Sequence, residues 1–199
     1  LKVGIVDYRC GNVRSLYNAF MHLNAEPFFI KTPDDFNQAT HIALPGVGSF
    51  SYCVNNLKES GLLNCLEKNI FTDHKPILGI CVGMQMLFES SEEGGLSNGL
   101  GWLKGKIKKL EKNVTDKIPH VGWNSAKFSK SCEQFNTDKE YDFYFDHSFA
   151  LDKSDLILST TTHTQTFISS VCHENILACQ FHPEKSQTNG INFLEMFLS

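Results

Sequence analysis

The sequence lacks the cysteine spacing of a disulfide framework or of a structural zinc site. It holds seven cysteines, an odd number, and no two of them form a Cys-x-x-Cys pair. Paired thiols at regular intervals mark disulfide-rich scaffolds and zinc sites. We therefore expect free thiols in a reducing, cytoplasmic setting, with no metal and no other cofactor.

Long apolar runs are also missing. No stretch approaches the roughly 20 apolar residues that a membrane-spanning helix needs. The chain opens on LKVGIVDY, a strand pattern, rather than on the charged and then apolar segments of a signal peptide. We expect no membrane contact.

The sequence has no large excess of positive or negative charge. Lysine and arginine number 18 against 22 aspartates and glutamates, which gives a net charge of −4 at pH 7. Binding to nucleic acid or to an anionic membrane needs a basic surface, so neither is expected as a partner. The one dense cluster, KGKIKKLEK at residues 104–112, is interpreted as a solvated lysine-rich face or hairpin.

The chain shows no repeat, low-complexity segment or Pro/Gly-rich linker, and we expect a single domain over residues 1–199. In the first half, strand-like runs (residues 3–8, 26–31, 40–46 and 76–81) alternate with helical patterns (residues 12–24, 51–71 and 83–91). Such alternation predicts an α/β fold, with a mostly parallel central sheet and helices on both faces.

The second half has a different pattern. Short β-like runs separated by polar turns occupy residues 103–157, among them residues 105–110 and 142–149. They predict extra antiparallel strands at an edge of the sheet. A last strand is expected over residues 176–185, and a helix over residues 189–199.

A cysteine lies where the strand of residues 76–81 gives way to a helix. The sequence GICVG puts Cys81 between Gly79 and Gly83, and these glycines permit the strained turn of a nucleophile elbow. The helix N-terminus would favour the thiolate, and the Val82 amide would become an oxyanion donor. Most free cysteines are instead buried structural residues. The glycine context favours the nucleophile.

A base for this thiol is found in QFHPEKS. His182 and Glu184 lie two residues apart, and on an extended segment residues at this spacing face the same side. Glu184 would then orient the imidazole of His182 and stabilise its charged form. Alone, the His-x-Glu spacing is a weak signal. Together with Cys81 it indicates a catalytic triad.

A second source of oxyanion donors is LPGVGSF, which follows the third strand. Its glycines flank Val47, so that no bulky side chain crowds the amides of Gly46, Val47 and Gly48. A plain turn is the alternative, because Gly and Pro clusters mainly mark turns.

Taken together, GICVGMQ, PGVGSF and HPEKS resemble the motifs of the class I (triad) glutamine amidotransferases. The resemblance continues in order through VDYRCGNVRSL, LFESSEEG, PHVGWN and YFDHSF, and it covers the whole chain. Within that family it is strongest to the glutaminase subunits of imidazole glycerol phosphate synthase, which act in histidine biosynthesis. The resemblance implies a flavodoxin-like fold.

The resemblance also implies glutamine as the substrate. Cys81 would attack the side-chain amide carbon, His182 would protonate the departing ammonia, and water would hydrolyse the glutamyl thioester to glutamate. The implied glutamine contacts are Gln85, Glu93, Ser148 and Phe149. Gln85 further lies one helical turn beyond Cys81, on the same face. The alternative for Gln85 is a surface or interface glutamine.

A protein partner is implied as well. In the family, a cyclase subunit with a (β/α)₈ barrel docks over the glutaminase site as a heterodimer. It receives the ammonia through its interior and makes imidazole glycerol phosphate and AICAR. The implied docking residues are Asn12, Trp123, Tyr144 and Lys185. For Trp123 the alternative is a core aromatic.

Three positions depart from the family pattern. Arg9 replaces a glycine, Asp146 an apolar residue and Phe149 a tyrosine, and all three are expected near the glutamine pocket or the docking face. They leave open a paralogous glutaminase that supplies ammonia for the amidation of surface sugars. A non-catalytic regulatory subunit and a stand-alone cysteine hydrolase are further alternatives. The complete triad argues against the regulatory subunit.

Overall fold

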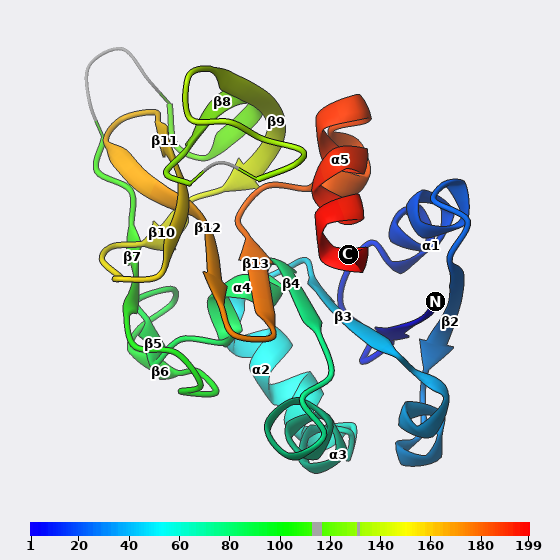
Figure 1. The fold of residues 1–199 in the computed structure, drawn as a ribbon. Coiled ribbons are helices and arrows are strands. Elements are labelled where there is room, and N and C mark those ends of the chain that lie inside the picture. The colour runs from blue at the N-terminus through cyan, green and yellow to red at the C-terminus, as the bar shows by residue number, and fades with distance from the viewer. Residues whose placement is uncertain (113–116, 131) are drawn as a thin grey trace.

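Five neighbouring strands run parallel at the centre of the fold (Figure 1). In the computed structural model, which describes residues 1–112, 117–130 and 132–199, they follow the order β2-β1-β3-β4-β13. Every residue of β4 is buried, as expected for a parallel strand covered on both faces. The five strands are β1 (Lys2–Val6), β2 (Glu26–Ile30), β3 (His41–Gly46), β4 (Ile77–Cys81) and β13 (Ile176–Cys179).

Helices cover both faces of these strands, which confirms the predicted α/β class. The connections from β1 to β2 and from β3 to β4 run in opposite directions across the sheet, so right-handed crossovers place their helices on opposite faces. Phe20 of α1 and Phe197 of α5 have ring centroids 6.1 Å apart, so these two helices share a face. The helical elements are α1 (Val13–His22), η1 (Pro33–Gln38), α2 (Phe50–Glu59), α3 (Leu63–Glu67), η2 (Lys68–Thr72), α4 (Val82–Met86), η3 (Pro183–Lys185) and α5 (Gln187–Leu198).

The second half adds antiparallel strands, as predicted. β12 (Thr166–His173) pairs antiparallel with β13 and begins two branches of the sheet. One branch runs through β10 (Phe149–Leu151), β7 (Lys106–Lys109), β5 (Ser90–Ser91) and β6 (Ser97–Asn98), where only β5 and β7 pair in parallel. The other runs through β11 (Ile157–Thr162), β8 (His120–Phe128) and β9 (Glu140–His147).

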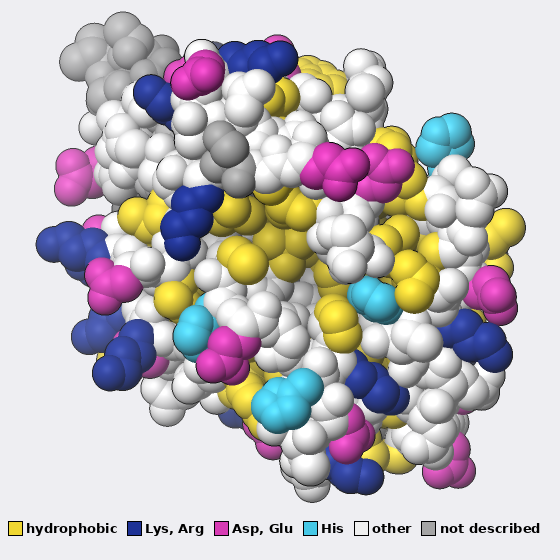
Figure 2. All heavy atoms as spheres, viewed as in Figure 1, with side chains coloured by type: hydrophobic (Ala, Val, Ile, Leu, Met, Phe, Trp, Pro, Cys, Tyr) yellow, Lys and Arg dark blue, Asp and Glu magenta, His cyan; other side chains and the backbone are white. Residues whose placement is uncertain are grey.

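The lysine-rich segment forms β7. Its lysines are exposed while Ile107 is buried, which confirms a solvated lysine-rich face. On the face of the molecule in Figure 2, basic and acidic side chains are interspersed. Within the described residues, no helix combines the length and the apolar character needed to cross a membrane.

Two elements are shorter than expected. The helix predicted for residues 83–91 is α4 alone, because the carbonyl groups of residues 86–89 accept hydrogen bonds from the amides of residues 99–103. The last strand, predicted for residues 176–185, ends at Cys179. Pro183 has no amide hydrogen to give to the sheet and instead begins η3.

A cluster of phenylalanines joins the antiparallel strands to the rest of the fold. Phe143 of β9 stacks on Phe181 with ring centroids 3.9 Å apart, and Phe193 of α5 lies 4.9 Å from Phe181. All three side chains are fully buried. This packing fixes β9 against the segment that follows β13.

Replacing Phe143 with alanine should destabilise the protein by about 3–5 kcal/mol, the usual cost of removing a buried ring. The free energy of unfolding from urea titration measures the effect. Phe71→Ala is the matched control, because the Phe71 side chain is 48% exposed; it should cost less than half as much. Equal losses would contradict a supporting role for the phenylalanine cluster.

Candidate active site

Cys81 ends β4 in a strained backbone conformation. Its φ is 53° and its ψ is −114°, backbone angles that residues other than glycine rarely adopt. The strain accompanies a close approach of two backbone segments. A Cβ at Gly83 would overlap the carbonyl oxygen of Leu44, and one at Gly46 would overlap the amide nitrogen of Gly83. The predicted strand-to-helix turn is present, and it places the thiol at the carboxyl edge of the sheet.

His182 and Glu184 lie in direct contact. Nδ1 of His182 is 2.9 Å from Oε1 of Glu184, and the side chains are 4% and 3% exposed. The expectation of an extended segment here is wrong. His182 precedes η3 and Glu184 lies within it, and the turn of this short helix brings the two side chains together.

The charge of His182 depends on its two neighbours. Burial alone lowers the pKa of His182, but the hydrogen bonds and charges of Cys81 and Glu184 outweigh burial and raise this pKa to about 10. The imidazolium is therefore favoured at neutral pH. Because α4 has only five residues, the helix dipole at Cys81 is weaker than the sequence suggested. The positive charge beside the thiol comes from His182.

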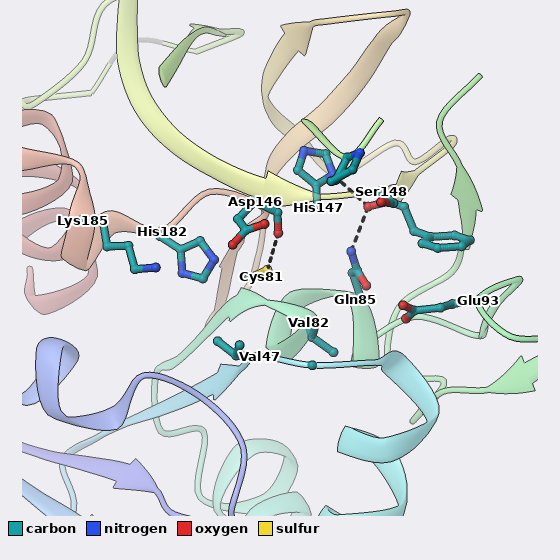
Figure 3. Close-up of a pocket in the computed structure, with 13 residues that line it drawn as sticks. Val47, Cys81, Val82, Gln85, Glu93, Asp146, His147, Ser148, His182 and Lys185 are labelled. Carbon is teal, nitrogen blue, oxygen red and sulfur yellow. Dashed lines mark hydrogen bonds between the residues drawn. The ribbon is translucent and has the colours of Figure 1, made fainter. Parts of the chain in front are cut away.

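A cavity of about 240 Å³ opens beside Cys81 (Figure 3). The amide of Gln180 lies 3.7 Å from Sγ of Cys81, and the carbonyl oxygen of Asp146 lies 3.9 Å from it. The walls come from the loop after β3, from α4, from the end of β9 and from η3. The lining residues are Val47, Gly48, Cys81, Val82, Gln85, Glu93, Pro119, Asp146, His147, Ser148, Phe149, His182 and Lys185.

The residues predicted as oxyanion donors separate into two groups. Val47, Gly48 and Val82 line the cavity. Gly46 does not; it faces the backbone of α4, where its missing Cβ permits the close contact with Gly83. Gly46 thus has a packing function in this structure.

Two side chains that the sequence analysis did not identify hold the end of β3 and the loop that follows it. The hydroxyl of Tyr8 donates a hydrogen bond to the carbonyl oxygen of Pro45 at 2.5 Å, and the thiol of Cys53 donates to that of Val47 at 3.5 Å. Burial raises the pKa of both Tyr8 and Cys53. Both groups therefore stay protonated and remain donors.

The four residues predicted to contact glutamine all line the cavity. Gln85 is buried, so the interpretation as a surface glutamine is wrong. Its amide nitrogen donates to the carbonyl oxygen of Phe149 at 2.9 Å and to Oε1 of Gln180 at 2.8 Å. Glu93 accepts a hydrogen bond from the amide of Phe50, the first residue of α2, at 2.6 Å.

Three of the four predicted docking residues lie together. Trp123 is 50% exposed, so the alternative of a core aromatic is wrong. Its ring meets that of Tyr144 edge-on at 6.3 Å, and Nζ of Lys185 lies 5.3 Å from the centre of the Tyr144 ring. We call these three residues the Trp123 patch. Asn12 lies instead at a small hollow that His182 also lines.

The three departures from the family pattern lie in two places. Asp146 and Phe149 line the cavity. Arg9 lines a different hollow, together with Asp7 and Lys31, so its side chain lies outside the glutamine pocket, and its place at the docking face stays a prediction. Its φ is 67°, in the left-handed region that glycine enters without strain. This explains why glycine suits the position.

Sequence reasoning missed two further residues of the site, Gln180 and His147. Both lie inside quoted motifs, QFHPEKS and YFDHSF, and both are buried. Their position inside motifs that carry predicted site residues was the available signal, whereas their burial is seen only in the structure. Within the described part of the chain, no group of three or more His, Cys, Asp or Glu side chains is arranged to hold a metal ion.

Known proteins share this arrangement of sequence and fold. The glutamine amidotransferase class-I family model matches residues 4–199. The chain is 40% identical to imidazole glycerol phosphate synthase subunit HisH 1 of Campylobacter jejuni (strain RM1221) over 98% of each chain. It is 38% identical to the chloroplastic imidazole glycerol phosphate synthase hisHF of Arabidopsis thaliana, over 98% of this chain and 34% of that one. A crystal structure of a glutamine amidotransferase superimposes with a TM-score of 0.77 at 16% identity, covering 98% and 96% of the two chains. That likeness supports the fold.

Glu184→Gln should lower the pKa of His182 from about 10. Loss of an adjacent opposite charge shifts a pKa by about 1–3 units, and NMR titration of the His182 ring measures it. The raised pKa contributes stability that is complete below about pH 6.5, the unfolded value, and that declines as the pH rises through about 10. The variant should lose part of this contribution. Glu184→Asp keeps the charge and is the control. An unchanged pKa in Glu184→Gln would contradict the assignment.

Proposed function

The chain belongs to the class I glutamine amidotransferase family, and we propose that it is the glutaminase subunit of an imidazole glycerol phosphate synthase in histidine biosynthesis. It hydrolyses glutamine to glutamate and ammonia and supplies the ammonia to a cyclase. The observation that carries the proposal is the cavity where the thiol of Cys81 and the His182–Glu184 pair come together.

The first half of the reaction releases ammonia. The Cys81 thiolate bonds to the side-chain amide carbon of glutamine, and the carbonyl electron pair moves onto oxygen. The amides of Val82 and of the loop at Val47 and Gly48 donate hydrogen bonds to this oxyanion. The His182 imidazolium then gives a proton to the amide nitrogen. The C–N bond breaks, ammonia leaves and a glutamyl thioester remains on Cys81.

The second half releases glutamate. Neutral His182 takes a proton from a water molecule while the water oxygen attacks the thioester carbon. Collapse of the second tetrahedral intermediate breaks the C–S bond and restores the thiolate and the imidazolium. Glu184 holds Nδ1 of His182 throughout, which leaves Nε2 for both proton transfers. One glutamine and one water give one glutamate and one ammonia.

The partner is a cyclase subunit with a (β/α)₈ barrel, docked on the Trp123 patch to form a heterodimer. The patch borders the cavity, because Lys185 belongs to both. An exposed tryptophan that packs on a half-buried tyrosine beside a cation is typical of an interface centre. The Arabidopsis relative also supports this pairing, since its name joins the two subunits and this chain covers 34% of its length.

A cytoplasmic setting fits the chemistry of the nucleophile. All seven cysteines are free in the structure, and a catalytic thiol must stay reduced to attack. Ammonia transfer to a biosynthetic partner requires the two subunits to share that compartment.

Cys81→Ala should abolish glutamine hydrolysis by the complex, by a factor on the order of 10⁴–10⁶, as expected for removal of a nucleophile. Product formation with added ammonia should be largely unchanged, because the cyclase site is separate. Cys132→Ala, at an exposed cysteine outside the cavity, is the control and should retain both activities. Loss of both activities in Cys81→Ala would refute the division of labour.

The same assay separates the alternative functions. Glutaminase activity that is negligible for the isolated chain and rises strongly with the co-purified barrel supports the proposal. Full activity of the isolated chain would indicate a stand-alone hydrolase. Absence of activity both with and without the barrel would indicate a regulatory subunit. Mass spectrometry of the co-purified barrel identifies the acceptor pathway and distinguishes histidine biosynthesis from sugar amidation.

Trp123→Ala should weaken cyclase binding by about 30-fold, or about 2 kcal/mol, the loss typical of an aromatic interface anchor. Isothermal titration calorimetry measures it. The melting temperature of the isolated chain should change little, because the Trp123 side chain is half exposed. Phe71→Ala, which removes a similarly exposed ring before the amino end of β4, should leave the affinity unchanged. Comparable weakening by both variants would argue against docking at the Trp123 patch.

A further inference from the structure

Two buried histidines beside the cavity have no part in the mechanism above. His120 of β8 and His147 of β9 are 3% and 6% exposed. Nδ1 of His120 lies 2.9 Å from Nε2 of His147. The ring of His120 also stacks on Phe145 at 4.7 Å and on His163 at 4.1 Å. The two imidazoles are thus held end to end by the sheet around them.

One backbone carbonyl sets the direction of their hydrogen bonds. Nδ1 of His147 lies 2.9 Å from the carbonyl oxygen of Phe149, which can only accept, so Nδ1 carries the proton. Nε2 of the neutral His147 ring then accepts from Nδ1–H of His120. Nε2 of His120 accepts in turn from the side-chain amide of Asn124 at 3.1 Å.

Asn124 is the first donor in this series of hydrogen bonds, and its other contacts support the same direction. Its amide nitrogen also donates to the carbonyl oxygen of Thr162 at 2.9 Å, and its side-chain oxygen accepts from the amide of Ser125 at 2.8 Å. These two bonds fix which end of the Asn124 side chain faces His120. Burial lowers the pKa of His147 to about 3 and that of His120 to about 4, so both rings are neutral at pH 7.

The same carbonyl group links the histidines to the nucleophile. Gln85 donates to the carbonyl oxygen of Phe149 and to Oε1 of Gln180, and Gln180 donates to Sγ of Cys81. Figure 3 shows Gln85 and His147 converging on this carbonyl oxygen from opposite sides. Because the carbonyl only accepts, it also fixes the orientation of the Gln85 amide, and through it that of Gln180.

We propose that His120 and His147 are positioning residues for glutamine, which form a neutral relay that holds the backbone at Ser148 and Phe149 in its binding conformation. The inference rests on the proposed function, because the cavity that Ser148 and Phe149 line is the glutamine site. The relay begins at Asn124, the residue after Trp123. It therefore joins the strand that carries the docking tryptophan to the loop that contacts substrate.

The tautomers test the relay without any assay of activity. Long-range ¹H–¹⁵N spectra of the ring nitrogens at pH 7 should show both His120 and His147 as neutral Nδ1–H tautomers. An Nε2–H tautomer or an imidazolium at either residue would overturn the relay. This measurement does not depend on whether the protein hydrolyses glutamine.

Kinetics of the complex with its cyclase test the positioning role. His120→Phe keeps a stacked ring but removes the donor to His147. It should raise KM for glutamine about tenfold, the size expected for one lost buried hydrogen bond, with a smaller change in kcat. His120→Asn keeps an N–H near the position of Nδ1 and should recover most of the loss. His163→Phe is the matched control: its Nε2 bonds to the carbonyl oxygen of Lys117, outside the relay, so KM should not change.

A second pair of variants covers the case in which His120→Phe does not fold. His147→Asn keeps a donor toward the Phe149 carbonyl but loses the acceptor for His120. It should raise KM less than His147→Leu, which loses both. An unchanged KM in every folded variant that lacks a donor would overturn the proposal, as would an equal rise in His163→Phe. Absence of glutaminase activity in the wild-type complex would refute the proposed function instead, and the NMR result would still stand.

Discussion

The site depends on the close approach of β3 and the first turn of α4. The backbone of Gly83 lies against the carbonyl group of Leu44, and that of Gly46 lies against the amide of Gly83, so no side chain separates the two segments. This approach accompanies the φ of 53° at Cys81. It also brings the loop after β3 and the start of α4 to the wall of one cavity. The thiol and the amides proposed to face it thus share a single backbone arrangement, and the buried parallel strands sustain its strain.

The antiparallel half of the chain completes the cavity from the other side. Phe143 packs on Phe181, and this contact fixes the end of β9 next to His182, whose amide donates to the carbonyl oxygen of Tyr144 at 2.8 Å. The carbonyl of Asp146 consequently reaches the thiol. Residues about 65 positions from Cys81 in the sequence become its neighbours, so the cavity forms only when both halves have packed together.

Local patterns in the sequence predicted what local physics determines. The apolar spacing of residues 12–24 predicted α1, and the glycines around Cys81 predicted the turn. The extent of α4 could not be predicted, because residues 99–103 end it through distant hydrogen bonds. The contact between His182 and Glu184 was predicted from an extended segment and is made by η3, so the spacing was informative although the conformation was not. Tyr8 and Gln180 act through partners 37 and 99 residues away, and no spacing rule relates such pairs.

The site keeps His182 charged and His147 neutral by giving the two rings different partners. His182 faces a thiol and a carboxylate, which raise its pKa to about 10 despite burial. His147 faces a backbone carbonyl and another imidazole, and burial lowers its pKa to about 3, with the charge of His182 among the contributing causes. A second imidazolium at His147 would oppose the first across the cavity. Neutrality of the proposed relay therefore favours the charge at His182, which is the charged imidazole beside the thiol of Cys81.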